Sequence, residues 1–311
     1  MKVLITGGAG FLGRGILKQS QDRSWEVTVY SRDETKQDEA RRRYPFARYI
    51  LGDVRDTERL ASAMTGHDYV IHAAAMKYIP DAELNATECI AVNVDGSRSV
   101  MRAAKQAQVK RVVATSTDKA VCPVNVYGAS KMLMERLFAD EAVLAPTSAG
   151  TSFACVRYGN VIGSTGSVLP LFAQQAEQLG KVRITDLRMT RFWMSVDEAI
   201  KTIVFALDPA TRPGSIVVPH ARAMTLVDAA RAATRADIEV EEIGSRPGEK
   251  IHESLIHWEE SIRVLRHSDR FELLPVGGEV GGEAFSVVSH TPQHRMSVEQ
   301  MRQHIAEAKE I

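Results

Sequence analysis

The sequence has few cysteines and no long apolar run. Cys89, Cys122 and Cys155 are its three cysteines, and their spacing excludes a disulfide framework and a paired-cysteine zinc site. No apolar stretch approaches the ~20 residues that a membrane-spanning helix needs, and residues 1–6 show no signal-peptide pattern. We therefore expect a soluble cytoplasmic protein with no metal site and no membrane partner.

The sequence also lacks an excess of either charge. It contains 39 Lys and Arg residues and 39 Asp and Glu residues, so no net field attracts it to nucleic acid. Its 311 residues are 44% hydrophobic, enough for a full core in one large domain or two interleaved ones. Small molecules are the partners that this composition favours.

Short apolar runs alternate with longer amphipathic stretches in the first half of the chain. The runs span residues 3–5, 26–30, 48–51, 69–72, 111–115 and 153–157. Strands that alternate with helices predict an α/β fold with a doubly wound parallel sheet. The alternation ends after Arg157 in a segment rich in Gly and Ser. We predict one domain over residues 1–157 and a smaller, partly interleaved α/β region over residues 158–311.

Two long helices are expected, near residues 82–108 and over residues 126–144. They either pair across a two-fold axis in a homo-oligomer, a dimer or a hexamer built from dimers, or simply cover the sheet.

Glycines at positions 7, 10 and 13 directly follow the first expected strand and lead into a helix. This context predicts a dinucleotide site, because a tight turn and a helix N-terminus together accommodate a pyrophosphate. A purely structural turn is the alternative. Further expected cofactor contacts are Phe11 and Leu12 in the helix, Asp53 and Val54 after the third strand, and Ala73, Ala74 and Ala75 after the fourth.

The end of the second strand bears on the choice between the two nicotinamide cofactors. Ser31, Arg32 and Lys36 suit the 2′-phosphate of NADP, whereas an acidic residue there would bind the free hydroxyl of NAD. NADP is therefore favoured. The alternative is that Asp33 binds the ribose and the two basic side chains are only solvated.

Tyr127 and Lys131 lie one helical turn apart on the same face of the expected helix. A nearby cation and an oxidised nicotinamide both favour the phenolate, so Tyr127 is expected to have a lowered pKa and to accept a hydroxyl proton. Asp118 and Lys119, at the end of the fifth strand, add an acid and an amine.

These motifs resemble the extended short-chain dehydrogenase/reductase family, and within it the sugar-nucleotide epimerases and dehydratases. Four further segments, at residues 116–121, 156–161, 189–193 and 246–253, narrow the resemblance to soluble, C5-inverting UDP-N-acetylglucosamine 4,6-dehydratases of bacterial polysaccharide synthesis. Lys119 stands where glucose-nucleotide dehydratases have Glu, and Tyr127 where membrane-anchored relatives that retain C5 have Met.

The resemblance implies a Rossmann domain that binds NADP and a C-terminal region that binds a UDP-sugar. Tyr127, assisted by Lys131, removes the O4 proton during C4 oxidation; Lys119 removes the C5 proton and Asp118 protonates the departing O6. It further implies catalytic participation of Thr117, a cofactor contact from Asn93, and substrate contacts from Lys77, Asn160, Val168, Arg191, Arg246 and Glu249. For Arg191 a structural salt bridge is the equal alternative.

Three other functions remain open at this point. A C4 epimerase would share the cofactor and Tyr127 but would not need Asp118 or Lys119. A dehydratase of different regiochemistry or C5 stereochemistry would use the same groups. A non-enzymatic NADP-binding regulator is disfavoured, since such proteins usually lose Tyr127 or Lys131.

Overall fold

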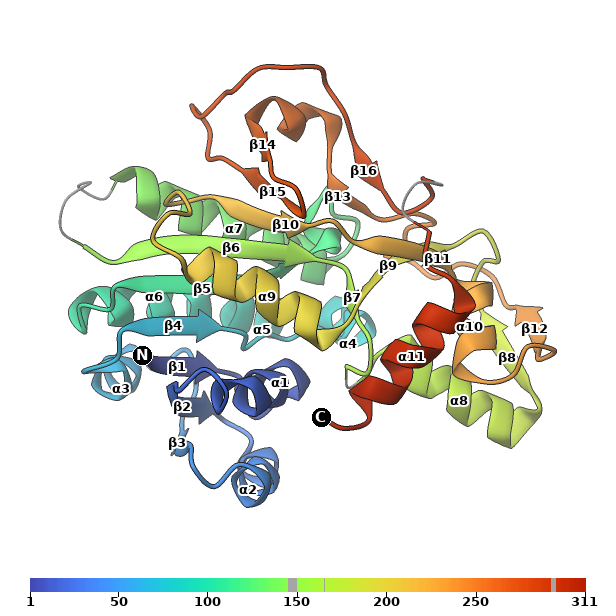
Figure 1. Ribbon diagram of the computed structural model, residues 1–311, viewed down its shortest axis with the longest axis horizontal. Helices are drawn as coiled ribbons and strands as arrows, with labels where there is room; N and C mark the ends of the chain where they lie inside the picture. Colours follow the sequence, from blue (N-terminus) through green and yellow to red (C-terminus); the bar gives the residue numbers. More distant parts are fainter. Residues whose placement is uncertain (145–149, 165, 292–294) are drawn as a thin grey trace.

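The computed structural model of the chain describes residues 1–144, 150–164, 166–291 and 295–311. Its centre is a nine-stranded sheet with the order β14-β15-β10-β6-β5-β4-β1-β2-β3 (Figure 1). The strands from β3 to β10 in this order are parallel, and β15 and β14 are antiparallel at one edge. The order β3-β2-β1-β4-β5-β6 is that of dinucleotide-binding folds, so the predicted doubly wound α/β fold is confirmed.

The six strands expected from the apolar runs are all present. They are β1 (Lys2–Thr6), β2 (Glu26–Ser31), β3 (Arg48–Leu51), β4 (Tyr69–His72), β5 (Arg111–Thr117) and β6 (Ser152–Tyr158), and the sheet is completed by β10 (Ile216–Pro219), β14 (Val264–Arg266) and β15 (Arg270–Leu273). β5 is buried at every position, as expected for a parallel strand covered on both faces.

Helices cover both faces of the sheet. On one face lie α3 (Thr57–Met64), α6 (Gly96–Gln106) and α7 (Val126–Leu144); on the other lie α1 (Phe11–Ser20) and α9 (Val196–Leu207), and α2 (Glu34–Arg43) joins β2 to β3. Along β1, Leu4 packs into the hydrophobic core between the sheet and α3, α6 and α7, whereas Val3 and Ile5 pack into the core between the sheet and α1 and α9. This alternation is the two-residue period of a strand buried on both faces.

The prediction of one continuous helix near residues 82–108 is wrong. The segment contains α4 (Ile79–Leu84), α5 (Ala86–Ile90), the π-helical turn η1 (Ala91–Asp95) and α6. Asn85, with φ −130° and ψ 53°, separates α4 from α5. The helix expected over residues 126–144 is present as α7.

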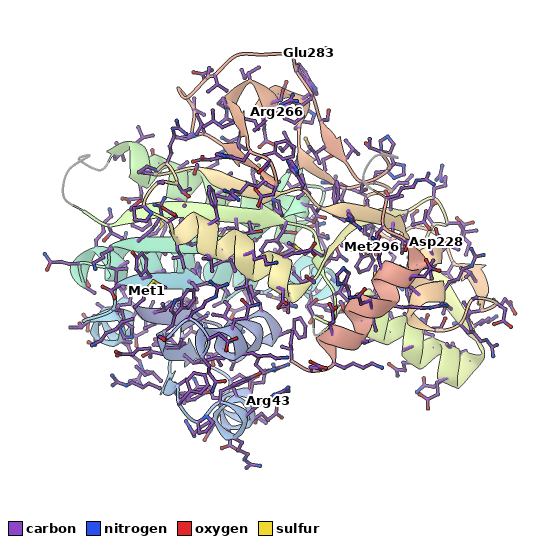
Figure 2. The ribbon with its side chains drawn as sticks, in the orientation of Figure 1. Met1, Arg43, Asp228, Arg266, Glu283 and Met296 are labelled. Atoms are coloured by element: carbon purple, nitrogen blue, oxygen red, sulfur yellow. The ribbon has the colours of Figure 1, made fainter. Side chains whose placement is uncertain are left out.

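Residues after Arg157 build a second, smaller layer and also contribute to the main sheet. The layer contains α8 (Val168–Leu179), α10 (Leu226–Ala233), α11 (Val298–Ala308) and the strands β7 (Asn160–Val161), β8 (Lys181–Ile184), β9 (Thr190–Met194), β11 (Arg222–Thr225) and β12 (Glu239–Glu242). Met296, labelled in Figure 2, precedes α11 and donates its backbone N–H to Ala223 O at 2.8 Å. The carboxyl ends of the parallel strands point toward this layer (Figure 1).

A third group of short elements lies beside the β14–β15 edge. It consists of β13 (Ser254–Ile256), which pairs with β16 (Val287–Val288), and the 3-10 helix η3 (Trp258–Arg263). In the part of the chain that the structure describes, no helix combines the length and apolar character needed to cross a bilayer.

Candidate active site

The glycine loop lies in close contact with the segment that follows β4. Gly7 has φ +70°, and a Cβ atom there would lie 2.8 Å from the Cα and N atoms of Ala74. A Cβ atom on Gly13 would lie 2.1 Å from the Gly8 carbonyl oxygen. Helix α1 begins with Gly10 as its N-cap and has no side-chain cap. Its first backbone N–H groups can therefore face an anion, which fits a pyrophosphate.

The alanine segment is fixed by hydrogen bonds to β1. Ala73 N donates to Thr6 O at 3.1 Å, and Ala74 N lies 3.4 Å from Thr6 Oγ1. His72 bonds Thr6 Oγ1 at 2.7 Å and Ser97 Oγ at 3.0 Å, which is a packing role for this buried histidine. Ala73, Ala74 and Ala75 are half-buried beside the loop, where a planar ring can approach the backbone.

Two of the residues expected at the 2′-position of the cofactor already have protein partners. Gln37 Nε2 donates to Ser31 O at 2.8 Å and to Ser31 Oγ at 3.1 Å. Lys36 Nζ lies 2.7 Å from Asp33 Oδ2, and Asp33 caps α2. The pKa of Asp33 is lowered, first by the hydrogen bonds from Lys36. Asp33 and Lys36, the two alternatives for ribose recognition, thus form one ion pair.

Arg32 extends toward the third strand rather than toward Lys36. Its Nη1 lies 3.8 Å from Asp53 Oδ2 and 3.6 Å from Glu88 Oε1. Asp53 is also held by Arg55, whose Nε and Nη2 donate to its two carboxylate oxygens at 2.9 and 2.7 Å. The adjacent Val54 is buried against α6. This end of the site therefore contains a network of exposed charges of both signs.

Asn93 holds the backbone after β4 in place. Its Oδ1 accepts from Met76 N at 2.8 Å, and its Nδ2 donates to Met76 O and to Ser130 Oγ, each at 2.9 Å. All its polar atoms are used, and the side chain is buried. The contacts show that Asn93 links this segment to α7; its expected contact with the cofactor stays a prediction.

Asp118 and Lys119 form a buried pair in the 3-10 turn η2 (Asp118–Ala120) at the end of β5. Asp118 Oδ1 accepts from Thr117 Oγ1 and from Lys119 Nζ, each at 3.0 Å. Asp118 Oδ2 is buried and has no hydrogen-bond partner among the described residues. Leaving a buried acceptor unpaired is costly, so this oxygen is well suited to a substrate hydroxyl.

A second carboxylate faces Lys119. Glu253 Oε1 lies 3.7 Å from Lys119 Nζ, and the side chains are 3% and 16% exposed. Burial alone would lower the pKa of Lys119, but the negative charges of Asp118 and Glu253 outweigh it and raise the pKa. The raised pKa favours the ammonium form of Lys119, whereas the role implied by the family resemblance, removal of the C5 proton, needs the neutral amine.

Tyr127 lies in the first turn of α7, next to this pair. Burial raises the pKa of its phenol, a hydrogen bond with Thr117 opposes this shift, and the charge of Asp118 adds to it. Burial lowers the pKa of Lys131 to about 8, and its Nζ donates to Met134 Sδ at 3.1 Å. Within the protein alone, burial therefore outweighs the groups that lower the Tyr127 pKa; the lowered pKa expected with an oxidised nicotinamide bound stays a prediction.

The segment over residues 246–253 folds onto the catalytic turn. Asn125 connects the two: its Nδ2 donates to Gly248 O at 2.8 Å, and its Oδ1 accepts from Gly128 N at 2.7 Å at the start of α7. Lys250 Nζ donates to Val121 O at 2.5 Å. Arg246 is exposed, whereas Glu249 is half-buried with an Oε2 atom that has no hydrogen-bond partner among the described residues.

Of the two roles considered for Arg191, the structure favours the structural one. Its Nη1 donates to Thr190 O at 2.8 Å and Ile251 O at 3.1 Å, and its Nε lies 3.9 Å from Glu253 Oε1. The side chain is 9% exposed, so it holds residues 190–191 and 251–253 together.

The other expected substrate residues come from three elements. Asn160 is half-buried in β7 and pairs in register with Trp193 of β9. Val168 is the first residue of α8, and Lys77 is exposed after the alanine segment. In the described part of the chain, none of these side chains forms a hydrogen bond with Asp118 or Lys119.

The sequence did not indicate three side chains that lie at this site, namely Glu253, Asn125 and Lys250. Glu253 and Lys250 lie within the segment that carried the family resemblance, but no spacing rule connects them to Lys119. Asn125 directly precedes a helix, which is the usual position of a capping residue and the one available signal.

The comparison with protein families gives one match that covers most of the chain. Residues 3–274 match the family described as polysaccharide biosynthesis protein. A UDP-N-acetylglucosamine 4,6-dehydratase (inverting) from Campylobacter jejuni subsp. jejuni serotype O:2 is 41% identical over 281 residues, 88% of this chain and 82% of that protein. A UDP-glucose 4-epimerase from Rickettsia canadensis is 38% identical over 289 residues, 89% of this chain and 83% of that protein.

A solved structure of similar sequence has the same fold as this chain. The X-ray structure of Pen from Bacillus thuringiensis superposes with a TM-score of 0.90 at 34% identity, covering 100% of this chain and 98% of that chain. The resemblance to extended short-chain dehydrogenases/reductases is confirmed. The chain belongs to the polysaccharide biosynthesis protein family.

Proposed function

We propose that the chain is an NADP-dependent dehydratase that converts UDP-N-acetylglucosamine to a UDP-4-keto-6-deoxy-hexosamine with inversion at C5. The observation that carries this proposal is the buried Asp118–Lys119 pair beside Tyr127. An acid and an amine there have no task in simple C4 epimerisation, whereas elimination of water needs both. The identity with the Campylobacter dehydratase supports the same reaction.

The glycine loop fits a dinucleotide, because Gly7 permits the tight turn against Ala74, Gly13 permits close packing of α1 on Gly8, and the N-terminus of α1 has no side-chain cap. When bound, NADP supplies a hydride acceptor for C4 and returns the hydride to C6. Tyr127 accepts the O4 proton at its phenolic oxygen, and Lys131 contributes positive charge below pH 8, where its amine remains protonated.

The ion pair can reach the forms that elimination needs by moving one proton. Transfer from the Lys119 ammonium to the Asp118 carboxylate, across 3.0 Å, gives a neutral amine and a carboxylic acid together. Lys119 then removes the C5 proton, Asp118 protonates O6 as it departs as water, and the ion pair is restored. The 4-ketone acidifies C5–H, so the order of steps is oxidation first and elimination second.

NADP rather than NAD is proposed because Arg32 and Lys36 are exposed at the end of β2 and bind carboxylates only at the surface, where ion pairs are weak. A 2′-phosphate, with more charge than either carboxylate, can displace these partners. We expect tighter binding of NADP than NAD, and Arg32→Ala should weaken NADP binding more than NAD binding. Titration of both proteins with both cofactors measures this, and a preference for NAD would defeat the assignment to NADP.

Arg246 and Glu249 are proposed to hold the UDP portion, the first at the pyrophosphate and the second at the ribose hydroxyls. Arg246 is exposed and suited to bidentate contact. The unpaired Oε2 of Glu249 is an available acceptor. Lys77, Asn160 and Val168 are proposed to line the sugar.

The proposed reaction is tested by incubation with UDP-N-acetylglucosamine in deuterated water, followed by NMR of the product. A 4-keto-6-deoxy sugar with deuterium at an inverted C5 is the expected result. The rival with support is C4 epimerisation, given the 38% identity to a UDP-glucose 4-epimerase. Interconversion of the O4 configuration without deuterium at C5 would establish that rival instead.

A further inference from the structure

We propose that Glu253 is a positioning residue for the elimination step: it holds the Lys119 amine and stabilises the ammonium ion that forms as Lys119 accepts the C5 proton. This inference rests on the proposed function and assigns a role to a side chain far along the chain from the catalytic turn.

The geometry places Glu253 beside Lys119 in a nearly dry environment. Glu253 Oε1 lies 3.7 Å from Lys119 Nζ, and the Glu253 side chain is 3% exposed. Its Oε2 has no hydrogen-bond partner among the described residues, although Lys250 Nζ lies 3.6 Å away. Charges at such distances interact strongly when water is excluded.

The backbone of Glu253 is fixed independently of Lys119. Glu253 N donates to Ser289 Oγ and Ser289 N donates to Glu253 O, each at 2.9 Å. Ser289 Oγ in turn bonds the Thr190 hydroxyl at 2.6 Å. The backbone that carries the Glu253 carboxylate is therefore held at a set position near Lys119.

The charged groups around the amine come from every element packed against it. Asp118 lies on η2, Glu253 precedes β13, Arg191 lies on β9, and Tyr127 on α7 faces Asp118; Lys250 faces Glu253. Burial lowers the pKa of Lys119, Asp118 and Glu253 raise it, and Arg191 lowers it, with a net rise.

The carboxyl groups of Asp118 and Glu253 have different roles in the elimination step. Asp118 carries the proton for O6 during elimination, so it is neutral when Lys119 begins to accept the C5 proton. Glu253 is then the remaining negative charge next to the amine, and it stabilises the positive charge that develops there. A carboxylate that orients a catalytic base and stabilises its protonated form is an established arrangement in enzymes.

The test compares wild type with Glu253→Gln, and measures keto-sugar formation against pH and cofactor reduction in a single turnover. Without the carboxylate the Lys119 pKa falls, so the alkaline limb of the elimination rate, at which the ion pair loses its shared proton, should move to lower pH by about one unit or more. The maximal elimination rate should fall by about tenfold or more, because a weaker base transfers protons more slowly. Cofactor reduction during C4 oxidation should keep its wild-type rate.

Two further variants distinguish loss of the proposed Glu253 role from a folding defect. Lys250→Gln removes a cation from Glu253 but keeps a donor for Val121 O, so the Lys119 pKa should rise and the alkaline limb should move to higher pH. Glu272→Gln is the matched control, since 2% of the whole residue is exposed for both Glu272 and Glu253, but Glu272 lies on β15. It should leave the pH profile unchanged.

An alkaline limb that stays in place in both Glu253→Gln and Lys250→Gln, while wild type forms the keto sugar, overturns the role of Glu253 and leaves the dehydratase intact. Failure of wild type to form a keto sugar counts against the proposed function instead. The two failures are therefore distinguishable.

Discussion

Asp118 and Lys119 are neighbours in the sequence, yet their side chains meet because the 3-10 turn at the end of β5 folds the chain back on itself. Thr117 caps this turn, with its hydroxyl accepting from Lys119 N at 3.3 Å and donating to Asp118. A single turn therefore carries a hydrogen-bond donor, an acid and an amine toward one point, next to Tyr127.

Lys119→Ala and Tyr127→Phe should separate the two halves of the reaction. Lys119→Ala should abolish dehydration, since each general acid or base contributes ~10²–10⁴-fold, but some cofactor reduction should survive. Tyr127→Phe should suppress both. Absorbance of the reduced cofactor and NMR of the sugar measure the two steps; normal product at a normal rate from Lys119→Ala would reject Lys119 as the base.

The identity of these residues could be predicted from the sequence because they lie in short, ordered motifs. Their ionisation states could not. The raised pKa of Lys119 depends on how closely Asp118 and Glu253 approach the amine in the fold, and the raised pKa of Tyr127 depends on burial. Both follow from tertiary packing, which no local pattern records.

At the scale of elements, Asn125 couples the start of α7 to the segment over residues 246–253. One side of its amide accepts from Gly128 N and the other donates to Gly248 O. The helix that carries Tyr127 and the segment proposed to bind the nucleotide are thus joined by one side chain. The sequence indicated both elements, but not their contact.

Asn125→Ala should lower the free energy of unfolding by about 1 kcal/mol or more, as expected for a lost helix cap. Asn125→Asp keeps an acceptor for Gly128 N but removes the donor to Gly248 O, so it should mainly raise KM for the UDP-sugar. Chemical denaturation and steady-state kinetics measure the two effects. Equal KM values for wild type and Asn125→Asp would show that the link does not serve substrate binding.

The prediction of α7 succeeded and that of a single helix over residues 82–108 failed for a physical reason. α7 is one uninterrupted helix, whereas Asn85 and the π-turn η1 interrupt the other segment. The π-turn contains Asn93, whose bonds to Met76 and Ser130 depend on neighbours outside the segment. Such tertiary effects override helical periodicity.

At the scale of the whole molecule, apolar side chains remain exposed on the helices expected to pair in a homo-oligomer. Leu84 of α4 is 84% exposed, Ile90 of α5 is 44% exposed and Leu133 of α7 is 45% exposed. Exposed leucines of this kind are typical of contact surfaces, although single ones are common on monomers.

If these helices form the contact, Leu133→Glu should reduce the oligomer to a smaller species in light scattering. Leu171→Glu is the matched control, because Leu171 is 44% exposed but lies on α8. It should leave the mass unchanged. A monomeric wild type, or a Leu133→Glu protein of unchanged mass, would contradict the predicted oligomer.

The late position of β10 in the chain has a consequence for biosynthesis. β6 pairs with β5 on one side and with β10 on the other, and β10 begins only at Ile216. Until the ribosome has released β10, one edge of the largely apolar strand β6 has backbone N–H and C=O groups without partners. Such an open edge can pair with other chains and cause aggregation. Chaperone dependence during synthesis, and insolubility of a fragment cut after residue 157, are the natural outcomes.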